Sequence, residues 1–291
     1  MKRRNPAGLA LGFALVALVC FAIQGLAQEP TYTFETFIYP GDTFTQTLGI
    51  NNSGKIAGYH GATINKGFTL VPPSSYTNEN YPNSAQTQVT GINTSGATVG
   101  FYISQSGVTS GFKAAAGVFT TVNYPGTTFN QLLGVNDEHQ AAGYYADSSG
   151  NDHAYVAALN GGVFSLITIP KAVSSQATGV NNSGEVCGFY IDSAMVNHGF
   201  LLDYGTFTVL NYPGATLTQA LGLNNTGEVV GFYLDSSSLS HGFVYSGGTF
   251  SSVDDPNGVG TTVINGVNDG GKIVGFYADS SGNTDGFLGT P

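Results

Sequence analysis

The stretch Gly222-Leu223-Asn224-Asn225-Thr226-Gly227-Glu228-Val229-Val230-Gly231-Phe232-Tyr233 contains the pattern that organises the whole chain. Its opening tripeptide, which is glycine, an aliphatic residue and asparagine, occurs six times, at intervals of 42, 43, 45, 43 and 44 residues. The six copies begin at Gly49, Gly91, Gly134, Gly179, Gly222 and Gly266. Self-similarity at a period of about 43 residues is typical of repeat architectures. The chain is therefore interpreted as six copies of one structural unit.

Each unit is predicted to hold four short antiparallel strands. Turns rich in asparagine and glycine separate the apolar runs, and no helical apolar period lies between them. The asparagine of the tripeptide is expected to form one of these turns, because asparagine commonly hydrogen-bonds the backbone that follows it. Four strands in about 43 residues are typical of a propeller blade, whereas solenoid repeats are usually shorter. We therefore predict an all-β fold, a six-bladed β-propeller with four antiparallel strands per blade.

The order of the strands predicts how the ring closes. The copies of the fourth strand begin at Phe34, Tyr76, Phe119, Phe164, Phe207 and Phe250. The first of these copies precedes the first Gly-aliphatic-Asn tripeptide, and the last unit ends at Pro291 without a fourth strand. We therefore expect the N-terminal strand, from Tyr32 to Tyr39, to complete the last blade and leave only short outer edges.

A glycine inside the second strand of each unit needs an explanation, because glycine weakens a strand. We expect the aromatic residue of the third strand to lie across it. The six predicted pairs are Gly58 with Phe68, Gly100 with Phe112, Gly143 with Tyr155, Gly188 with Phe200, Gly231 with Phe243 and Gly275 with Phe287.

The N-terminus is predicted to direct the protein out of the cytoplasm. Residues 1–27 contain Lys2-Arg3-Arg4, an apolar run from Leu9 to Ile23 and the small residues of Gly25-Leu26-Ala27, a pattern typical of a secretory signal peptide. The apolar run is shorter than the roughly 20 residues of a membrane span. Residues 28–291 are thus predicted to form a single domain, secreted or periplasmic by the general secretory route, with no membrane insertion after cleavage.

The charge of the predicted mature chain excludes several partners. Five Lys and no Arg remain against eighteen acidic residues, so nucleic acid is not an expected partner. Without arginine, no guanidinium group is available to form paired hydrogen bonds with a phosphate or carboxylate group. Cys187 remains as a lone cysteine, so no intramolecular disulfide forms, and its alignment with Ala and Val predicts a small buried residue. A monomer is expected.

The aligned units resemble the HAF family of bacterial extracellular repeats, which is named for a His-Ala-Phe tripeptide. Three units carry a form of it, namely His153-Ala154-Tyr155, His198-Gly199-Phe200 and His241-Gly242-Phe243. The first position is Lys66, Ser110 and Asp285 in the other three units. The resemblance covers nearly all of residues 31 to 291. It implies export and a repeat fold, and it brings no general activity and no catalytic residues.

A fixed spacing of six residues joins an aspartate to a histidine in three units, at Asp147, Asp192 and Asp235. In the last unit the same two positions are Asp279 and Asp285. The favoured interpretation is a hydrogen bond across a hairpin. The alternative is a calcium site on that face, formed by Asp147, Asp192, Asp235 and Asp279 together with carbonyl groups. No other cofactor is expected.

Glutamine precedes the glycine of the tripeptide by three residues in five units, at Gln46, Gln88, Gln131, Gln176 and Gln219. These positions fall on the predicted innermost strand, where a ring of amides would surround a wet channel or would hold a small ligand near the axis. Tyr124 and Tyr212, in Tyr-Pro-Gly segments at the same end, are expected to pack between blades, or alternatively to stack on a sugar or peptide.

No catalytic residue is predicted. The acidic residues that break the repeat, in Asp137-Glu138-His139 and Asp254-Asp255, fall in predicted turns, where solvated charges are expected without the paired geometry of a glycosidase. We therefore predict a secreted, non-enzymatic binding module for an extracellular glycan or protein. The alternatives are a propeller hydrolase or lyase with its site at the central channel, and a structural component of the cell envelope.

Overall fold

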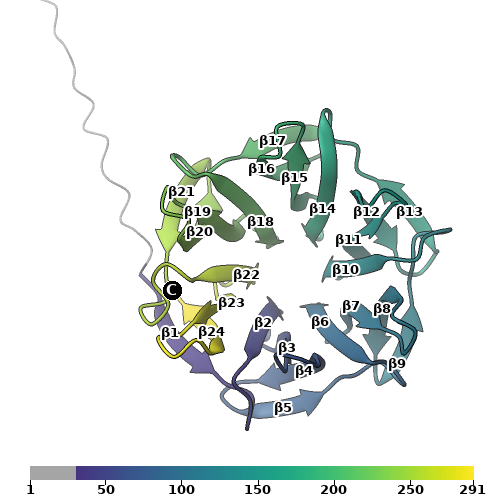
Figure 1. Cartoon of the computed structure of the whole chain (residues 1–291), viewed down its shortest axis with the longest axis horizontal. Coiled ribbons are helices and arrows are strands. Elements are labelled where there is room, and N and C mark those ends of the chain that lie inside the picture. Colours follow the sequence, from purple (N-terminus) through teal and green to yellow (C-terminus); the bar gives the residue numbers. More distant parts are fainter. Residues whose placement is uncertain (1–30) are drawn as a thin grey trace, which may run out of the picture.

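The computed structural model describes residues 31–291, and the predicted signal peptide at residues 1–27 lies outside the described residues. Six four-stranded sheets surround one axis and form a closed ring (Figure 1). All strand pairs within these sheets are antiparallel, as in β2 with β3 and β3 with β4. The predicted six-bladed β-propeller is therefore confirmed. Within residues 31–291, no helix has the length and apolar character needed to cross a membrane.

The four strands of each blade follow one another from the axis outward. Blade 1 consists of β2 (Thr45–Ile50), β3 (Ile56–His60), β4 (Lys66–Val71) and β5 (Ser75–Asn78). Blade 2 consists of β6 (Gln86–Ile92), β7 (Thr98–Ile103), β8 (Thr109–Ala115) and β9 (Val118–Thr121). Blade 3 consists of β10 (Asn130–Val135), β11 (Gln140–Ala146), β12 (Asp152–Ala158) and β13 (Val163–Leu166).

The remaining blades have the same arrangement. Blade 4 consists of β14 (Ala172–Val180), β15 (Val186–Asp192), β16 (Asn197–Asp203) and β17 (Thr206–Leu210). Blade 5 consists of β18 (Leu217–Leu223), β19 (Val229–Leu234), β20 (Ser240–Ser246) and β21 (Thr249–Val253). Blade 6 consists of β22 (Val263–Val267), β23 (Ile273–Ala278), β24 (Thr284–Thr290) and β1 (Thr33–Phe37).

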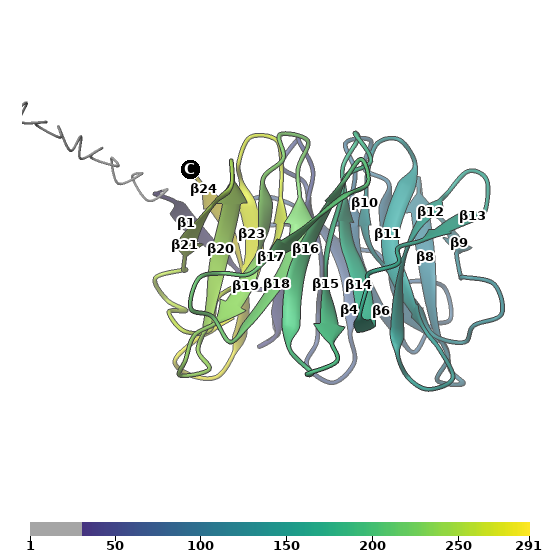
Figure 2. The same cartoon turned by 90° about the horizontal axis from the view of Figure 1, so that it is seen from above.

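The strands run between two faces of the ring, which Figure 2 shows edge-on. On the Asn-turn face, the asparagine of each tripeptide begins the turn between the first and second strands of a blade, as at Asn51. On the Tyr-Pro face lie the segments that lead from an outer strand to the next inner strand, such as the one containing Tyr124, and the hairpins between second and third strands.

The ring closes through the N-terminal strand. In Figure 1, β1 lies beside β24, and the register pairs Thr33 with Thr290 and Phe37 with Gly286. The observed strand, Thr33–Phe37, is shorter than the expected segment. The side chain of Phe37 is only 3% exposed and belongs to an apolar cluster with Ile56. The predicted completion of the last blade is therefore confirmed.

Aromatic side chains fill the blades as the glycine pattern predicts. A Cβ added to Gly188 would lie 2.8 Å from Cζ of Phe200, and the same close approach recurs in four other blades. At Gly143 the nearest atoms belong instead to Gln131 and Leu132. Cys187 is wholly buried as predicted, and burial raises the pKa of its thiol to about 12.

Tyr155 is the one tyrosine at an aromatic position that is otherwise phenylalanine, and it provides a stability test. Its side chain is wholly buried and its hydroxyl has no hydrogen-bond partner. A buried polar group without a partner costs about 1–3 kcal/mol. We therefore expect Tyr155→Phe to raise the free energy of unfolding by about 1 kcal/mol, measured by chemical denaturation. A loss of stability would show that the hydroxyl has a favourable interaction.

Candidate functional site

The five glutamines lie on innermost strands, but their side chains are engaged with the blades. The hydroxyl of Tyr59 donates to Gln46 at 2.7 Å, and Tyr144 does the same to Gln131 at 2.9 Å. The other three glutamine amides donate to side chains of the preceding blade: Gln88 to Asn65, Gln176 to Asp152 and Gln219 to Asn197. None of the five lines either of the two cavities on the axis. Their ligand-binding role stays a prediction.

The two tyrosines on the Tyr-Pro face lie in aromatic stacks. The ring of Tyr212 stacks on Tyr233, with centroids 3.6 Å apart and planes inclined by 5°. The ring of Tyr124 stacks on Tyr145 at 4.4 Å and meets Phe164 edge-on at 5.5 Å. One face of each ring is therefore covered by the blade that follows it, and stacking of a sugar or peptide on these rings stays a prediction.

Two of the three Asp-His pairs form the hairpin hydrogen bond of the favoured interpretation, and the third is longer than a hydrogen bond. Oδ2 of Asp147 lies 2.9 Å from Nε2 of His153, and Oδ2 of Asp192 lies 3.3 Å from Nε2 of His198. For Asp235 and His241 the distance is 3.7 Å. The His153 contact and two backbone N–H groups lower the pKa of the Asp147 carboxyl to about 2.

The four aspartates of the calcium hypothesis occupy four different blades. Oδ1 of Asp279 accepts the backbone N–H groups of Ser281 and Asn283, and the other three aspartates make the same two bonds within their own turns. No group of three or more His, Cys, Asp or Glu side chains that could hold a metal ion is present in residues 31–291. Calcium binding stays a prediction.

The two acidic residues that break the repeat between blades 5 and 6 differ in environment. Asp254 is paired with Nδ1 of His241 at 2.6 Å. Asp255 is wholly buried, contrary to the expectation of a solvated charge, and burial raises the pKa of its carboxyl. The physical reason is that the turn folds back onto the blade: a Cβ on Gly258 would lie 2.2 Å from Cβ of Tyr277.

An uninterrupted ring of asparagines surrounds the axis near the Asn-turn face. Nδ2 of Asn51 donates to the backbone oxygen of Asn93 in the next blade at 3.0 Å. The same bond passes from Asn93 to Asn136, Asn181, Asn224 and Asn268, and from Asn268 back to Asn51. Oδ1 of Asn51 also accepts the N–H groups of Ser53 and Lys55 in its own turn. Each side chain therefore both forms its turn, as predicted, and joins two blades.

A second ring, which we call the axial rim, lies one residue further along the chain. It consists of Asn52, Thr94, Asp137, Asn182, Asn225 and Asp269. Five of its six neighbouring pairs are joined by a backbone N–H that donates to the side-chain oxygen of the next blade, at 2.8–3.0 Å. Both carboxylates of the rim accept further bonds, for example from Nδ2 of Asn182 to Asp137 and from Nδ2 of Asn52 to Asp269.

The two rim carboxylates, Asp137 and Asp269, belong to blades 3 and 6 and therefore lie on opposite sides of the axis. Burial raises the pKa of Asp269, but hydrogen bonds from Asn225 and Asn52 outweigh it and hold the pKa below its ordinary value. The axial rim is thus a hydrogen-bonded ring of three amides, one hydroxyl and two carboxylates, and the carboxylates give it negative charge. The sequence pattern alone did not single it out, although the position after each tripeptide asparagine is polar in all six units.

Below the two rings the channel is nearly closed. The innermost strands touch at the tripeptide glycines: a Cβ on Gly222 would lie 3.0 Å from Cα of Gly266. A β-bulge precedes each of these glycines, and the extra residue of the bulge lines the cavity on the axis. These residues are Leu48, Thr90, Leu133, Thr178, Leu221 and Asn265. The two axial cavities measure about 60 and 70 Å³, enough for a few water molecules and too little for a sugar ring.

Comparisons with known proteins support the fold and give no closer relationship. No family model matches this chain, and neither does any curated protein. Putative TolB from Agrobacterium tumefaciens is similar in structure, with a TM-score of 0.61 at 9% identity over 85% of this chain and 91% of that one. TolB from Acinetobacter baumannii is also similar, with a TM-score of 0.56 at 13% identity. The match covers 82% of this chain and 64% of that protein.

A six-bladed lectin is also similar. The Aleuria aurantia lectin in complex with Fucα1-6GlcNAc gives a TM-score of 0.51 at 11% identity, over 85% of this chain and 93% of the lectin. At such identities the likeness shows a shared six-bladed propeller fold. Because one fold hosts many functions, function has to be argued from the site.

Proposed function

We propose that the protein is an exported, non-enzymatic binding module that engages an extracytoplasmic glycan or protein through its Asn-turn face. A cationic group of the partner, such as a primary ammonium, would sit on the axial rim between Asp137 and Asp269. The rim carries this proposal, because its two carboxylates are fixed in place by hydrogen bonds before any ligand arrives. A preorganised site avoids the entropy loss of ordering its side chains on binding.

The charge balance and the fold support this assignment. Residues 31–291 contain five Lys, no Arg and seventeen acidic residues, so the protein attracts cations rather than anions. The Aleuria aurantia lectin shows that a propeller of this type holds a saccharide. The predicted signal peptide, the resemblance to HAF repeats and the likeness to TolB support an extracellular or periplasmic location.

The rim is tested by Asp137→Asn combined with Asp269→Asn. Asparagine already occupies the same position at Asn52, Asn182 and Asn225, so the substitutions keep the ring while removing both charges. We expect binding of a glucosamine oligosaccharide to weaken at least about tenfold, because hydrogen bonds to charged groups contribute about 1.5–3 kcal/mol. Titration calorimetry measures this, and binding should also weaken with added salt.

The matched control is Glu138→Gln, which removes an exposed charge next to the rim and should leave binding unchanged. The N-acetylated form of the same oligosaccharide is the neutral ligand, and a lysine-containing peptide tests a protein partner. Equal binding of charged and neutral oligosaccharides would contradict a cation site. Loss of binding on Tyr124→Ala and Tyr212→Ala would instead favour the Tyr-Pro face, and repeating the titration with a calcium chelator tests the predicted metal.

A further inference from the structure

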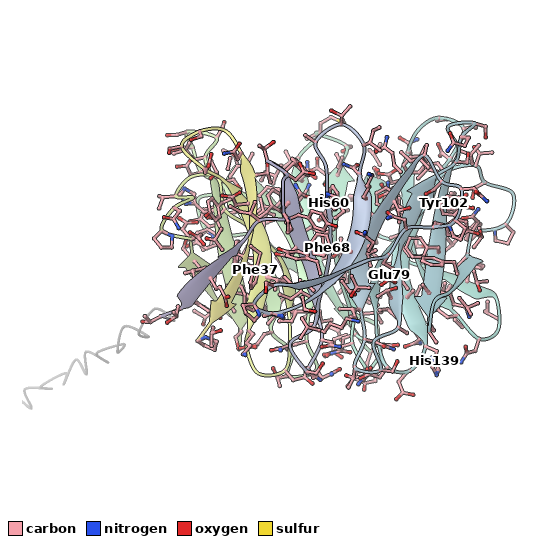
Figure 3. The ribbon with its side chains drawn as sticks, turned by 90° about the horizontal axis from the view of Figure 1, so that it is seen from below. Phe37, His60, Phe68, Glu79, Tyr102 and His139 are labelled. Carbon is pink, nitrogen blue, oxygen red and sulfur yellow. The ribbon has the colours of Figure 1, made fainter. Side chains whose placement is uncertain are left out.

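A cleft of about 490 Å³ lies between blades 1 and 2 and opens beside the Asn-turn face. In Figure 3, Glu79 lies between the two faces of the ring, with His60 and Tyr102 toward one face and His139 at the other. The side chains that line the cleft include Lys55, Thr69, Thr77, Glu79, Ser95 and Phe119. Its volume falls within the range of about 300–1,000 Å³ that is usual for small-molecule sites.

Three polar residues at this blade interface, Thr69, Glu79 and Thr98, occupy positions that are apolar at four of the five other interfaces; the exception has Lys113 at the position of Thr69. At four other interfaces, the three equivalent residues pack together in one apolar cluster. These sets are Val156, Ile167 and Val186; Leu201, Leu210 and Val229; Val244, Val253 and Ile273; and Leu288, Phe37 and Ile56. The interface between blades 1 and 2 therefore replaces a hydrophobic contact with a carboxyl and two hydroxyl groups.

Glu79 is hydrogen-bonded at this interface through both its backbone and its carboxyl. Its backbone N–H donates to the carbonyl oxygen of Gly67 at 2.9 Å, and the Thr98 hydroxyl donates to Oε1. Thr69 and Thr98 are each only 1% exposed. Burial raises the pKa of Glu79 above its ordinary value, against the opposing effects of the Thr98 hydrogen bond and the positive charge of Lys55.

We expect this arrangement, in which a half-buried carboxyl lies beside two buried threonines, to be less stable than an apolar interface. A buried charged group is less favourable than well-packed apolar residues of similar volume. Natural sequences break their own packing pattern chiefly at functional sites. Glu79 also lines the cleft and is bonded to Thr98, so the departure from the apolar pattern and the cleft coincide.

We infer that the cleft between blades 1 and 2 is a binding pocket for a neutral saccharide whose hydroxyl groups donate hydrogen bonds to Glu79. A carboxylate that accepts hydroxyl donors forms charge-assisted hydrogen bonds, which are about twice as strong as neutral ones. Lys55 supplies a donor at the opening, and the half-buried ring of Phe119 supplies an apolar surface for the face of a sugar. This pocket is separate from the axial rim and does not depend on it.

The experiment compares the wild type with Glu79→Gln and with Glu79→Val combined with Thr98→Val. Ligand-observed NMR uses glucose, galactose, mannose, fucose, N-acetylglucosamine and cellobiose as probes, and glycine and alanine represent amino acids. At least one sugar should bind the wild type, bind Glu79→Gln at least tenfold more weakly, and fail to bind the double variant. Because valine restores the apolar contact, the double variant should also melt at a higher temperature than the wild type.

The control is the rim variant Asp137→Asn with Asp269→Asn, which should bind the sugar as the wild type does. Binding of none of the sugars, binding of the amino acids instead, or sugar binding that survives Glu79→Gln would overturn the inference. A double variant that melts below the wild type would show that Glu79 and Thr98 stabilise the fold, which would also overturn it. The rim proposal is tested separately, because its readout is the weaker binding of the charged oligosaccharide to Asp137→Asn with Asp269→Asn, a variant that leaves Glu79 in place.

Discussion

Removal of residues 31–40 is expected to abolish the cooperative unfolding of the protein and to cause aggregation. This segment contains β1, which supplies the outer strand of blade 6 and links the beginning of the propeller to its last strand, with Thr33 paired to Thr290 and Phe37 to Gly286. Its loss exposes the edge of β24 and the apolar cluster around Ile56 and Leu288. The net stability of a domain, about 5–15 kcal/mol, is too small to absorb such a loss.

Size-exclusion chromatography and thermal unfolding measure this effect, and a circular permutant provides the matched control. Because β1 and β24 are antiparallel and Thr33 lies opposite Thr290, a short turn can join Pro291 to Tyr32. A chain that begins at Gly41 and carries residues 32–40 after Pro291 keeps every strand and should be monomeric with near-normal melting. If the truncated protein were itself monomeric with unchanged melting, closure by β1 would not stabilise the ring.

The architecture could be predicted from the sequence because it depends on counting and order. The fourth-strand copy at Phe34 precedes the first tripeptide at Gly49. The last unit contains its tripeptide but has no fourth-strand copy after it. These two facts require a strand to be exchanged between the ends of the chain in a closed ring. The finer geometry did not affect that conclusion: β1 is Thr33–Phe37 rather than the longer segment expected.

The site was harder to predict because side-chain direction depends on blade packing. The glutamines were correctly placed on innermost strands, yet each sheet faces its neighbouring blades, so Gln88 and Gln176 reach residues of the preceding blade. The axis is reached instead at β-bulges, where the extra residue, such as Leu48, departs from the simple alternation of a strand. The two-residue alternation of side chains along a strand does not reveal where such a bulge lies.

Two acidic residues illustrate what alignment of the repeat can and cannot provide. Glu79 aligns with apolar residues such as Val122 and Leu210, so its departure from the pattern is visible in the sequence. The cleft beside it is not, because it depends on how blades 1 and 2 pack. Asp255 was expected to be solvated because it lies in a turn, and only the packing of that turn on Tyr277 shows that it is buried.

Gly231→Ala is expected to destabilise the protein by more than about 4 kcal/mol, a loss reserved for severe steric or backbone disruption. A Cβ at this position would lie 1.9 Å from the carbonyl oxygen of Gln219 and 2.9 Å from Cε1 of Phe243. The first atom is backbone of the paired strand and the second belongs to a wholly buried ring, so neither can move away without disturbing β18 and β19 or the core.

The matched control for this substitution is Gly161→Ala, whose nearest neighbour would be Cγ2 of Val163 at 3.9 Å. Alanine there should leave stability within about 0.5 kcal/mol of the wild type or raise it slightly, because it restricts the unfolded chain. Both changes add one methyl group, so the difference in their free energies of unfolding isolates the steric role of Gly231. If the two variants unfolded alike in urea, the aromatic ring of Phe243 would not require glycine beneath it, and the recurrence of this pair from blade to blade would need another cause.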